Sequence, residues 1–144
     1  MDFFTAMQVS ASGLSAQRTR MNVASSNLAN VSTTHGPDGG PYRRRDVVLT
    51  SRPAAEAISG GRAGGSPSVY EAAVKKIQQD KQPPRLEYDP GHPDANPDGY
   101  VAYPNVSAVE EMVDMITASR AYQAGVTALE SAVSLAERAI GIGK

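Results

Sequence analysis

The sequence contains no cysteine among its 144 residues. Disulfide bonds, zinc–thiolate sites and thiol nucleophiles are therefore excluded, while the redox compartment stays open. Tryptophan is also absent, and there are only two phenylalanines and six tyrosines. Apolar residues make up 40% of the chain, and many of them are alanine or valine. We therefore expect no large self-contained core, so that the apolar surface must be buried in another way.

Neither sign of charge dominates, because 14 lysines and arginines face 15 aspartates and glutamates, for a net charge of −1. This balance argues against a dedicated nucleic-acid binder, whose affinity rests on neutralised phosphates. The first residues, MDFFTAMQVSASGLSAQR, lack a basic start and a continuous apolar stretch, so we expect no Sec-type signal peptide. No run of 18 apolar residues occurs, which argues against a transmembrane helix. If the protein acts outside the cytoplasm, it must be exported by a route other than the Sec pathway.

Proline and glycine divide the chain into three segments. All ten prolines lie within 37–104, and nine of the thirteen glycines lie within 36–99. Because both residues interrupt helices and mark turns, we expect helix at the two ends and strands or loops between them. The sequence thus predicts an α+β fold with an N-terminal helix in 1–34, an inserted β-rich and loop-rich domain in 35–104, and a C-terminal helix in 105–144.

The N-terminal segment carries one helical stripe with steps of three and four residues. Its apolar members are Phe4, Met7, Ala11, Leu14, Met21 and Leu28, with Arg18 and Ser25 in the two gaps. Gly13 costs about 1 kcal/mol relative to alanine in a helix, so it marks either close packing or a weak point. Asn27, Asn30 and Ser32 weaken the helix, and Gly36-Pro37 ends it.

The C-terminal segment begins with Ser107-Ala-Val-Glu110, a capping-box pattern, just after Pro104. Acidic residues follow in the first turns, where they favour the positive end of a helix. A helix over 107–140 would be roughly 50 Å long. Its stripe is Met115, Ala118, Tyr122, Val126, Leu129, Val133, Ala136 and Ile140, and Gly141 and Gly143 end it.

The middle segment contains three candidate strands, Val47–Thr50, Leu86–Tyr88 and Tyr100–Tyr103, separated by turn-rich stretches. Gly60–Gly65 is typical of a flexible loop. The stretch Val69–Gln79 suits either a helix or an irregular strand by composition alone.

Two mildly amphipathic helices of this length need partners, because isolated helices gain little stability from propensity. One interpretation is an antiparallel helix pair that closes on a small domain. The other is that the helices pack with helices of other subunits in a coiled-coil layer. The two interpretations differ in whether the free monomer is already well ordered.

The middle segment also offers candidate binding motifs. Asp94-Ala-Asn96-Pro-Asp98-Gly99 matches the first half of a calcium loop, but position 12 is Asn105 rather than glutamate. His92 and His35 are the only histidines and give no zinc pattern. A turn is the favoured interpretation of 89–98, and a metal-dependent binding module is the competing one.

The basic cluster Arg43-Arg44-Arg45 could contact nucleic acid, but Asp46 follows at once. A solvated strand edge or an ion pair between subunits is the favoured interpretation. No nucleophile elbow, phosphate loop or catalytic constellation is present. We therefore expect no enzyme activity, no catalytic residues, no cofactor and no bound metal, and neither nucleic acid nor a small-molecule substrate as partner.

Seven segments together carry a specific set of motifs, and they are Ser12–Gln17, Ala24–Asn30, Gly36–Arg44, Tyr88–Ala95, Gly99–Val106, Glu110–Met115 and Ala118–Ala124. These segments resemble the flagellar rod and hook axial proteins, and more narrowly the basal-body rod proteins. The resemblance covers 5–50 and 84–142, whereas 53–82 matches only in general character. Gly125 departs from the family pattern, in which asparagine commonly follows Gln-Ala, so this turn should be loosened or admit a close neighbour.

The resemblance implies a structural subunit of the proximal rod of the flagellar basal body, a drive shaft in the periplasmic space. It implies export by the flagellar type III apparatus without a cleaved signal peptide, and terminal segments that order on assembly. It also implies β-strand near 73–78. Expected partners are other copies of the chain, proximal and distal rod proteins and the export apparatus. The alternative function is a soluble helical adaptor or export chaperone.

We expect the terminal helices to supply the contacts between subunits, with the middle segment as an outer β-containing layer. The expected interface residues are Leu14, Met21, Leu28, Met112, Ile116, Tyr122, Val126, Leu129 and Val133.

Overall fold

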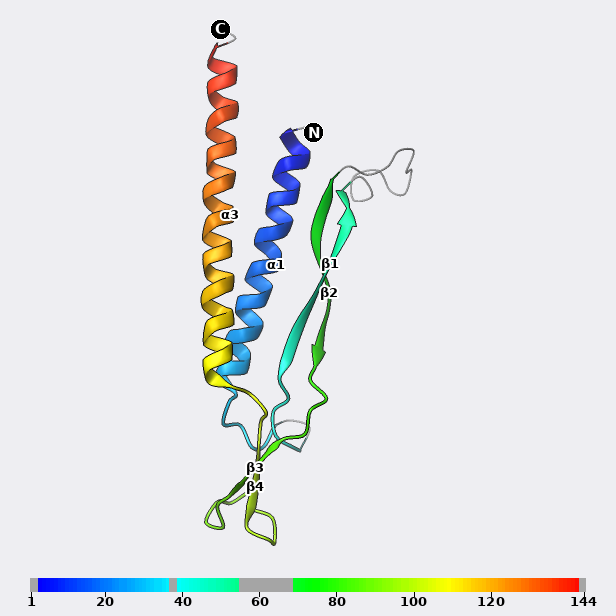
Figure 1. Ribbon diagram of the computed structural model, residues 1–144, viewed down its shortest axis with the longest axis vertical. Helices are drawn as coiled ribbons and strands as arrows, with labels where there is room; N and C mark the ends of the chain where they lie inside the picture. The colour runs from blue at the N-terminus through cyan, green and yellow to red at the C-terminus, as the bar shows by residue number, and fades with distance from the viewer. Residues whose placement is uncertain (1–2, 37–38, 55–68, 143–144) are drawn as a thin grey trace. The chain divides into compact units, whose positions relative to one another are not determined.

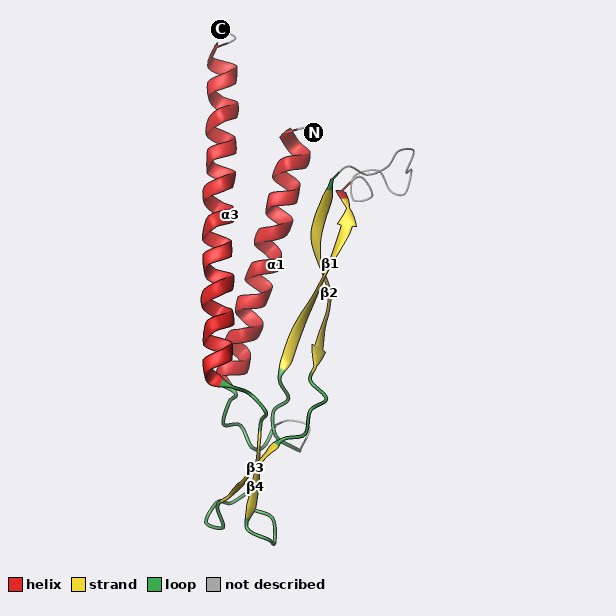
Figure 2. Ribbon diagram, viewed as in Figure 1, coloured by secondary structure: helices red, strands yellow, loops and turns green. Residues whose placement is uncertain are grey.

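The computed structural model describes residues 3–36, 39–54 and 69–142. Figure 1 shows two long helices near the ends of the chain, with four strands between them in sequence. The order is α1 (Phe3–Ala29), β1 (Arg45–Pro53), β2 (Tyr70–Gln79), β3 (Arg85–Tyr88), β4 (Tyr100–Tyr103) and α3 (Ala108–Ile142). Figure 2 shows the same division into helix, strand and loop. The predicted α+β fold class, with terminal helices and a β-containing region between them, is confirmed.

Both predicted helices form, and local hydrogen bonds define their inner ends. The Ser107 hydroxyl accepts a hydrogen bond from the N–H of Glu110 at 3.4 Å, as expected for an N-cap. At the other junction, the Asn30 side chain donates to the Ser26 carbonyl at 2.8 Å. Thr33 then bonds to the Asn30 side chain at 3.2 Å. These local bonds compete with helix, and α1 ends at Ala29.

The four strands form two separate two-stranded sheets, β1 with β2 and β3 with β4. The β1–β2 pair is antiparallel, because the N–H of Asp80 reaches the Arg44 carbonyl at 2.7 Å and the N–H of Ala54 reaches the Val69 carbonyl at 3.0 Å. In the second hairpin, Arg85 lies opposite Tyr103. All three predicted strands are confirmed.

Within the ambiguous stretch Val69–Gln79, residues Tyr70–Gln79 form strand β2, as the family resemblance implied. The predicted loop Gly60–Gly65 lies outside the described residues.

The connection between β3 and β4 is a hydrogen-bonded turn. The Asn96 side-chain oxygen accepts from the N–H of Asp98 at 3.0 Å and from the N–H of Tyr100 at 2.8 Å. Gly99 has a φ of 82°, and a Cβ there would lie 2.8 Å from the Tyr88 ring. The structure therefore confirms a turn where the sequence also suggested half of a calcium loop.

The chain forms two compact units, each containing part of both helices. The described part of the first unit is 3–19, 49–54, 69–75 and 117–142. Its buried side chains include Ala16, Ala54, Glu71 and Ala118. The Ser12 hydroxyl accepts a hydrogen bond from the N–H of Ala72 at 3.2 Å, which joins α1 to β2 within this unit.

Glu71 is the polar centre of the first unit. Its carboxylate accepts a hydrogen bond from Gln8 at 3.3 Å and pairs with Arg52. Since Glu71 is 2% exposed, these partners offset much of the cost of burying its charge.

The described part of the second unit is 20–36, 39–48 and 76–116. Its buried apolar residues are few and small, as the composition predicts. They are Ala24, Val101, Pro104 and Val106. Two polar side chains, Asn27 and Glu111, are also buried here.

The α3 stripe is seen in the structure, whereas the buried face of α1 is displaced from the predicted row. Most α3 stripe residues are buried or half-buried, but Ile140 is exposed. In α1, Phe4 is 74% exposed, and the buried side chains are Ala16, Ala24 and Asn27. The most deeply buried side chains of α1 are therefore small or hydrogen-bonded, whereas the large side chains of the predicted row are half-buried or exposed.

The two helical glycines should respond differently to substitution. No atom lies within 4 Å of the position that a Cβ on Gly13 would occupy, whereas a Cβ on Gly125 would lie 2.8 Å from Leu14 Cδ2. We expect Gly13→Ala to stabilise the helix by about 1 kcal/mol. We expect Gly125→Ala to gain less, because Leu14 must move. Urea unfolding followed by circular dichroism measures both, and equal gains would contradict this explanation.

Candidate functional site

Asn27, near the end of α1, uses all of its side-chain hydrogen-bonding groups inside the second unit. Its amide nitrogen donates to the Arg45 carbonyl and to Glu111 Oε2, both at 2.9 Å. Its amide oxygen accepts from the N–H of Arg45 at 3.0 Å and from the Tyr42 hydroxyl at 2.9 Å. The residue is 1% exposed. A buried amide with this full set of partners fixes its neighbours in one arrangement.

Glu111, in the first turn of α3, is the charged partner in this cluster and is 2% exposed. Its second carboxylate oxygen accepts a hydrogen bond from Arg44 Nε at 2.5 Å. Arg44 also pairs with Asp46 at 2.7 Å and approaches Asp114 at 3.8 Å. The buried carboxylate thus has a partner from α1 and another from the segment just before β1.

The Arg44 guanidinium keeps its charge at all ordinary pH values. Burial by itself lowers the pKa of Arg44, whereas the hydrogen bond and the charge of Glu111 raise it. Asp46 and Asp114 add to this attraction, so the pKa lies above its usual value. Loss of the proton from Arg44 therefore does not limit this ion pair.

We call Asn27, Tyr42, Arg44, Arg45 and Glu111 the junction cluster. It joins the end of α1, the segment leading into β1 and the start of α3, which are far apart in sequence. Within the described residues, no buried side-chain nitrogen or oxygen lacks a hydrogen-bond partner. This arrangement suits structural positioning, since every buried polar side-chain atom of the cluster is already engaged.

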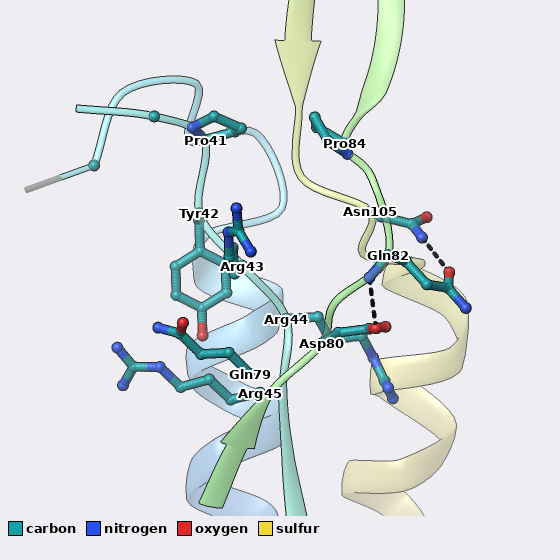
Figure 3. Close-up of a pocket in the computed structure, with 12 residues that line it drawn as sticks. Pro41, Tyr42, Arg43, Arg44, Arg45, Gln79, Asp80, Gln82, Pro84 and Asn105 are labelled. Carbon is teal, nitrogen blue, oxygen red and sulfur yellow. Dashed lines mark hydrogen bonds between the residues drawn. The ribbon is translucent and has the colours of Figure 1, made fainter. Parts of the chain in front are cut away.

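An open cavity of about 310 Å³ lies beside the junction cluster. Figure 3 shows Arg43, Arg44 and Arg45 on one segment and Asp80 and Gln82 on the opposite one. Gln82 forms hydrogen bonds with two other residues of the cavity wall. Its backbone N–H donates to the Asp80 carboxylate at 2.9 Å, and its side-chain oxygen accepts from the Asn105 amide at 2.5 Å.

The three arginines have different surroundings. Arg44 is half-buried in an ion pair within its own chain, whereas Arg43 and Arg45 are exposed. The guanidinium of Arg45 lies 5.8 Å from the centre of the Tyr42 ring. The sequence interpretation as a solvated edge thus describes Arg43 and Arg45, but it missed the buried ion pair of Arg44.

The first turns of α3 also present an apolar face. Val109, Met112, Val113 and Ile116 follow the spacing of one helix face and are 71%, 48%, 57% and 50% exposed. Apolar side chains clustered on a surface in this way are typical of an interaction site. We call these four residues the α3 face.

The structure divides the nine expected interface residues into two groups. Met112 and Ile116 are exposed, on the α3 face. The others are half-buried, and they are Leu14, Met21, Leu28, Tyr122, Val126, Leu129 and Val133.

Within residues 3–36, 39–54 and 69–142, no three His, Asp or Glu side chains gather closely enough to hold a metal ion. No helix in the described part of the chain is both long and apolar enough to span a membrane.

Comparison with known proteins gives matches at both ends and over the whole length. The family "Flagella basal body rod protein" matches 7–37. The family "Flagellar basal body rod FlgEFG protein C-terminal" matches 98–142. The flagellar basal-body rod protein FlgC of Borreliella burgdorferi is 42% identical, over 99% of this chain and 98% of the relative. FlgC of Bacillus subtilis is 42% identical and FlgC of Salmonella typhimurium is 38% identical, each over the full length of both chains.

The chain belongs to the FlgC family of flagellar basal-body rod proteins. The resemblance found in the sequence is thereby confirmed. In this member of the FlgC family, Asn27 lies in the segment that the first family matches and Glu111 in the segment that the second matches. Arg44 lies between the two matched segments, so the junction cluster connects them through the middle of the chain.

Sequence reasoning missed the junction cluster, although a signal for it was present. Glu111 lies one turn before Met115 and on the same face of α3. The apolar stripe of α3 is therefore preceded by a carboxylate. A charged residue on the buried face of a helix needs a partner of opposite charge. The Arg43–Arg45 cluster offered one, but nothing in the sequence indicated which arginine reaches it.

Removing the Glu111 carboxylate should destabilise the chain strongly. Glu111→Ala removes the acceptor of one Asn27 amide hydrogen and of the Arg44 Nε–H, and breaking such a buried pair costs about 3–5 kcal/mol. The matched control is Glu87→Ala, whose carboxylate pairs with Arg85 at 2.7 Å on the surface. That exposed pair contributes at most about 1 kcal/mol.

Urea unfolding of both variants measures the difference. Adding Asn27→Ala to Glu111→Ala should cost less than the sum of the single changes, because the two residues share one network. Equal losses from Glu111→Ala and Glu87→Ala would show that the junction cluster does not stabilise the fold.

Proposed function

We propose that this chain is a structural subunit of the proximal rod of the flagellar basal body and helps to transmit torque as part of its drive shaft. The observation that carries the proposal is the full-length similarity to FlgC rod proteins. The exposed α3 face adds support, since it offers apolar surface to a neighbouring subunit. The relatives are rod proteins, so a soluble adaptor or export chaperone is not favoured.

The subunits polymerise through their terminal helices. In this proposal, 1–34 and 105–144 act as the assembly segments and pack in a coiled-coil-like layer, while 35–104 forms the inserted domain. Met112 and Ile116 are already exposed for such contacts. The other seven expected interface residues are half-buried, and contacts in the assembly would bury them further. They are Leu14, Met21, Leu28, Tyr122, Val126, Leu129 and Val133.

Assembly also completes the ordering of the helices. The junction cluster holds the inner ends of α1 and α3 through several polar contacts. Away from it, the buried side chains of the helices are small, such as Ala16 and Ala118. Packing of this kind stabilises a helix weakly, so the outer parts of the helices depend on neighbouring subunits.

The partners are other copies of the chain, other proximal and distal rod proteins, and the flagellar export apparatus. The chain acts without catalysis. It works in the periplasmic part of the rod and reaches it without cleavage of a signal peptide. Mass spectrometry of the subunit from purified basal bodies would detect an intact N-terminal segment if this route is used.

Substitution of Leu129 tests assembly directly. Leu129 is half-buried on the α3 stripe, and a carboxylate there would have to be desolvated in a helical layer. In the source bacterium with its own gene deleted, we expect Leu129→Glu to abolish incorporation and swimming. Immunoblotting of purified basal bodies and motility in soft agar measure the two effects.

The matched control is Ala128→Glu, which places the same charge on the neighbouring exposed position of α3. We expect this variant to retain incorporation. A fully motile Leu129→Glu strain would contradict the proposed contact. Failure of the unsubstituted chain to enter basal bodies would contradict the proposed function itself.

A further inference from the structure

The α3 face points away from the interior of its own unit. Glu111, which separates Val109 from Met112 in sequence, is buried, whereas the four apolar residues around it are exposed. The helix therefore directs its carboxylate inward and its large apolar side chains outward. This reversal of the usual pattern indicates that the α3 face is covered by another chain.

The border of the α3 face is acidic. Glu110 is exposed beside it, and Asp114 is half-buried. Together with Val109, Val113 and Arg44, these carboxylates line an open hollow of about 360 Å³. The segment 108–119 contains no lysine or arginine. In this hollow α3 therefore contributes the carboxylates, and Arg44, from the segment before β1, contributes the basic group.

The outer row of α1 has complementary properties. It follows the spacing of one helix face over several turns and consists of small or polar side chains around a single arginine. Its exposed members are Ala11, Ser15, Arg18, Asn22, Ser25 and Ala29. We call these residues the α1 row.

We propose that the α3 face of one copy packs on the α1 row of a second copy of this chain. This inference rests on the proposed function and specifies which surfaces meet. Large side chains on one helix and small ones on the other allow close packing. The aliphatic part of Arg18 covers apolar surface while its guanidinium reaches Glu110 at the border.

Contact between two different surfaces has a different symmetry from contact of one surface with itself. When the same patch meets itself, the pair is closed, whereas a head-to-tail contact leaves both surfaces free at the ends. The α3 face and the α1 row lie on different helices, so each copy offers one of each. Such a contact repeats along an assembly.

Cross-linking tests the pairing cleanly, because the chain has no cysteine. A strain lacking its own gene would co-express two tagged copies, one with Met112→Cys and one with Ser25→Cys. Basal bodies would be purified and oxidised, and cross-links between the two tags would be measured. The control replaces Met112→Cys by Ala121→Cys, which is exposed on α3 but lies off the α3 face.

We expect cross-links between positions 112 and 25, and at least roughly five-fold fewer with position 121. Cross-links mainly between two copies of position 112, or equal yields with the control, would overturn the inference while leaving the proposed function intact. Absence of the unsubstituted chain from basal bodies would overturn both.

Charge exchange provides an independent test. Glu110→Lys and Arg18→Glu each place like charges together, and we expect each to lower the amount in basal bodies roughly five-fold. The double variant restores the opposite pair and should recover most of the loss. Glu130→Lys, an exposed change on α3 outside the contact, should have little effect. A double variant as weak as the single ones would overturn the pairing of Arg18 with Glu110.

Discussion

The structure depends most on the side chain of Asn27. Its amide group forms hydrogen bonds with both the N–H and the carbonyl of Arg45, with the Tyr42 hydroxyl and with the Glu111 carboxylate. Because it is buried, any other arrangement of these segments would leave polar groups without partners. Arg44 then neutralises Glu111 from the other side. The end of α1, the entry to β1 and the start of α3 are thus fixed by polar contacts rather than by a large apolar core.

This constraint explains how a chain without tryptophan or cysteine holds two long helices. The buried apolar side chains of the described residues are mainly alanines and valines, which release little apolar area from water. The larger ones, such as Met112 and Ile116, lie on the surface. Buried polar contacts therefore position the elements, while the larger apolar groups remain available to neighbouring chains. In a subunit of a helical assembly, the free energy gained by burying large apolar side chains would therefore come mainly from contacts between subunits.

Much of the fold could be predicted because it follows local patterns. Ser107 marks the start of α3, and the strand-favouring stretches Leu86–Tyr88 and Tyr100–Tyr103, separated by turn residues, mark the second hairpin. The strand at 70–79 could not be derived from composition, because Val69, Ala73 and Ile77 also suit a helix. The junction cluster could not be predicted either, since it joins side chains from segments far apart in sequence. The buried face of α1 could not be predicted for the same reason. It contains Ala16 and Ala24, whereas the prediction followed the largest apolar residues of the helix.

The most direct test of the role of Asn27 is hydrogen exchange on the purified chain at low concentration. We expect slow exchange where the junction cluster holds the backbone, at 24–29, 42–48 and 108–116, and fast exchange in the outer parts of both helices. We also expect Asn27→Ala to remove the protection in all three segments together. Strong protection along the whole of α1 and α3 in the free chain, unchanged by Asn27→Ala, would contradict this role.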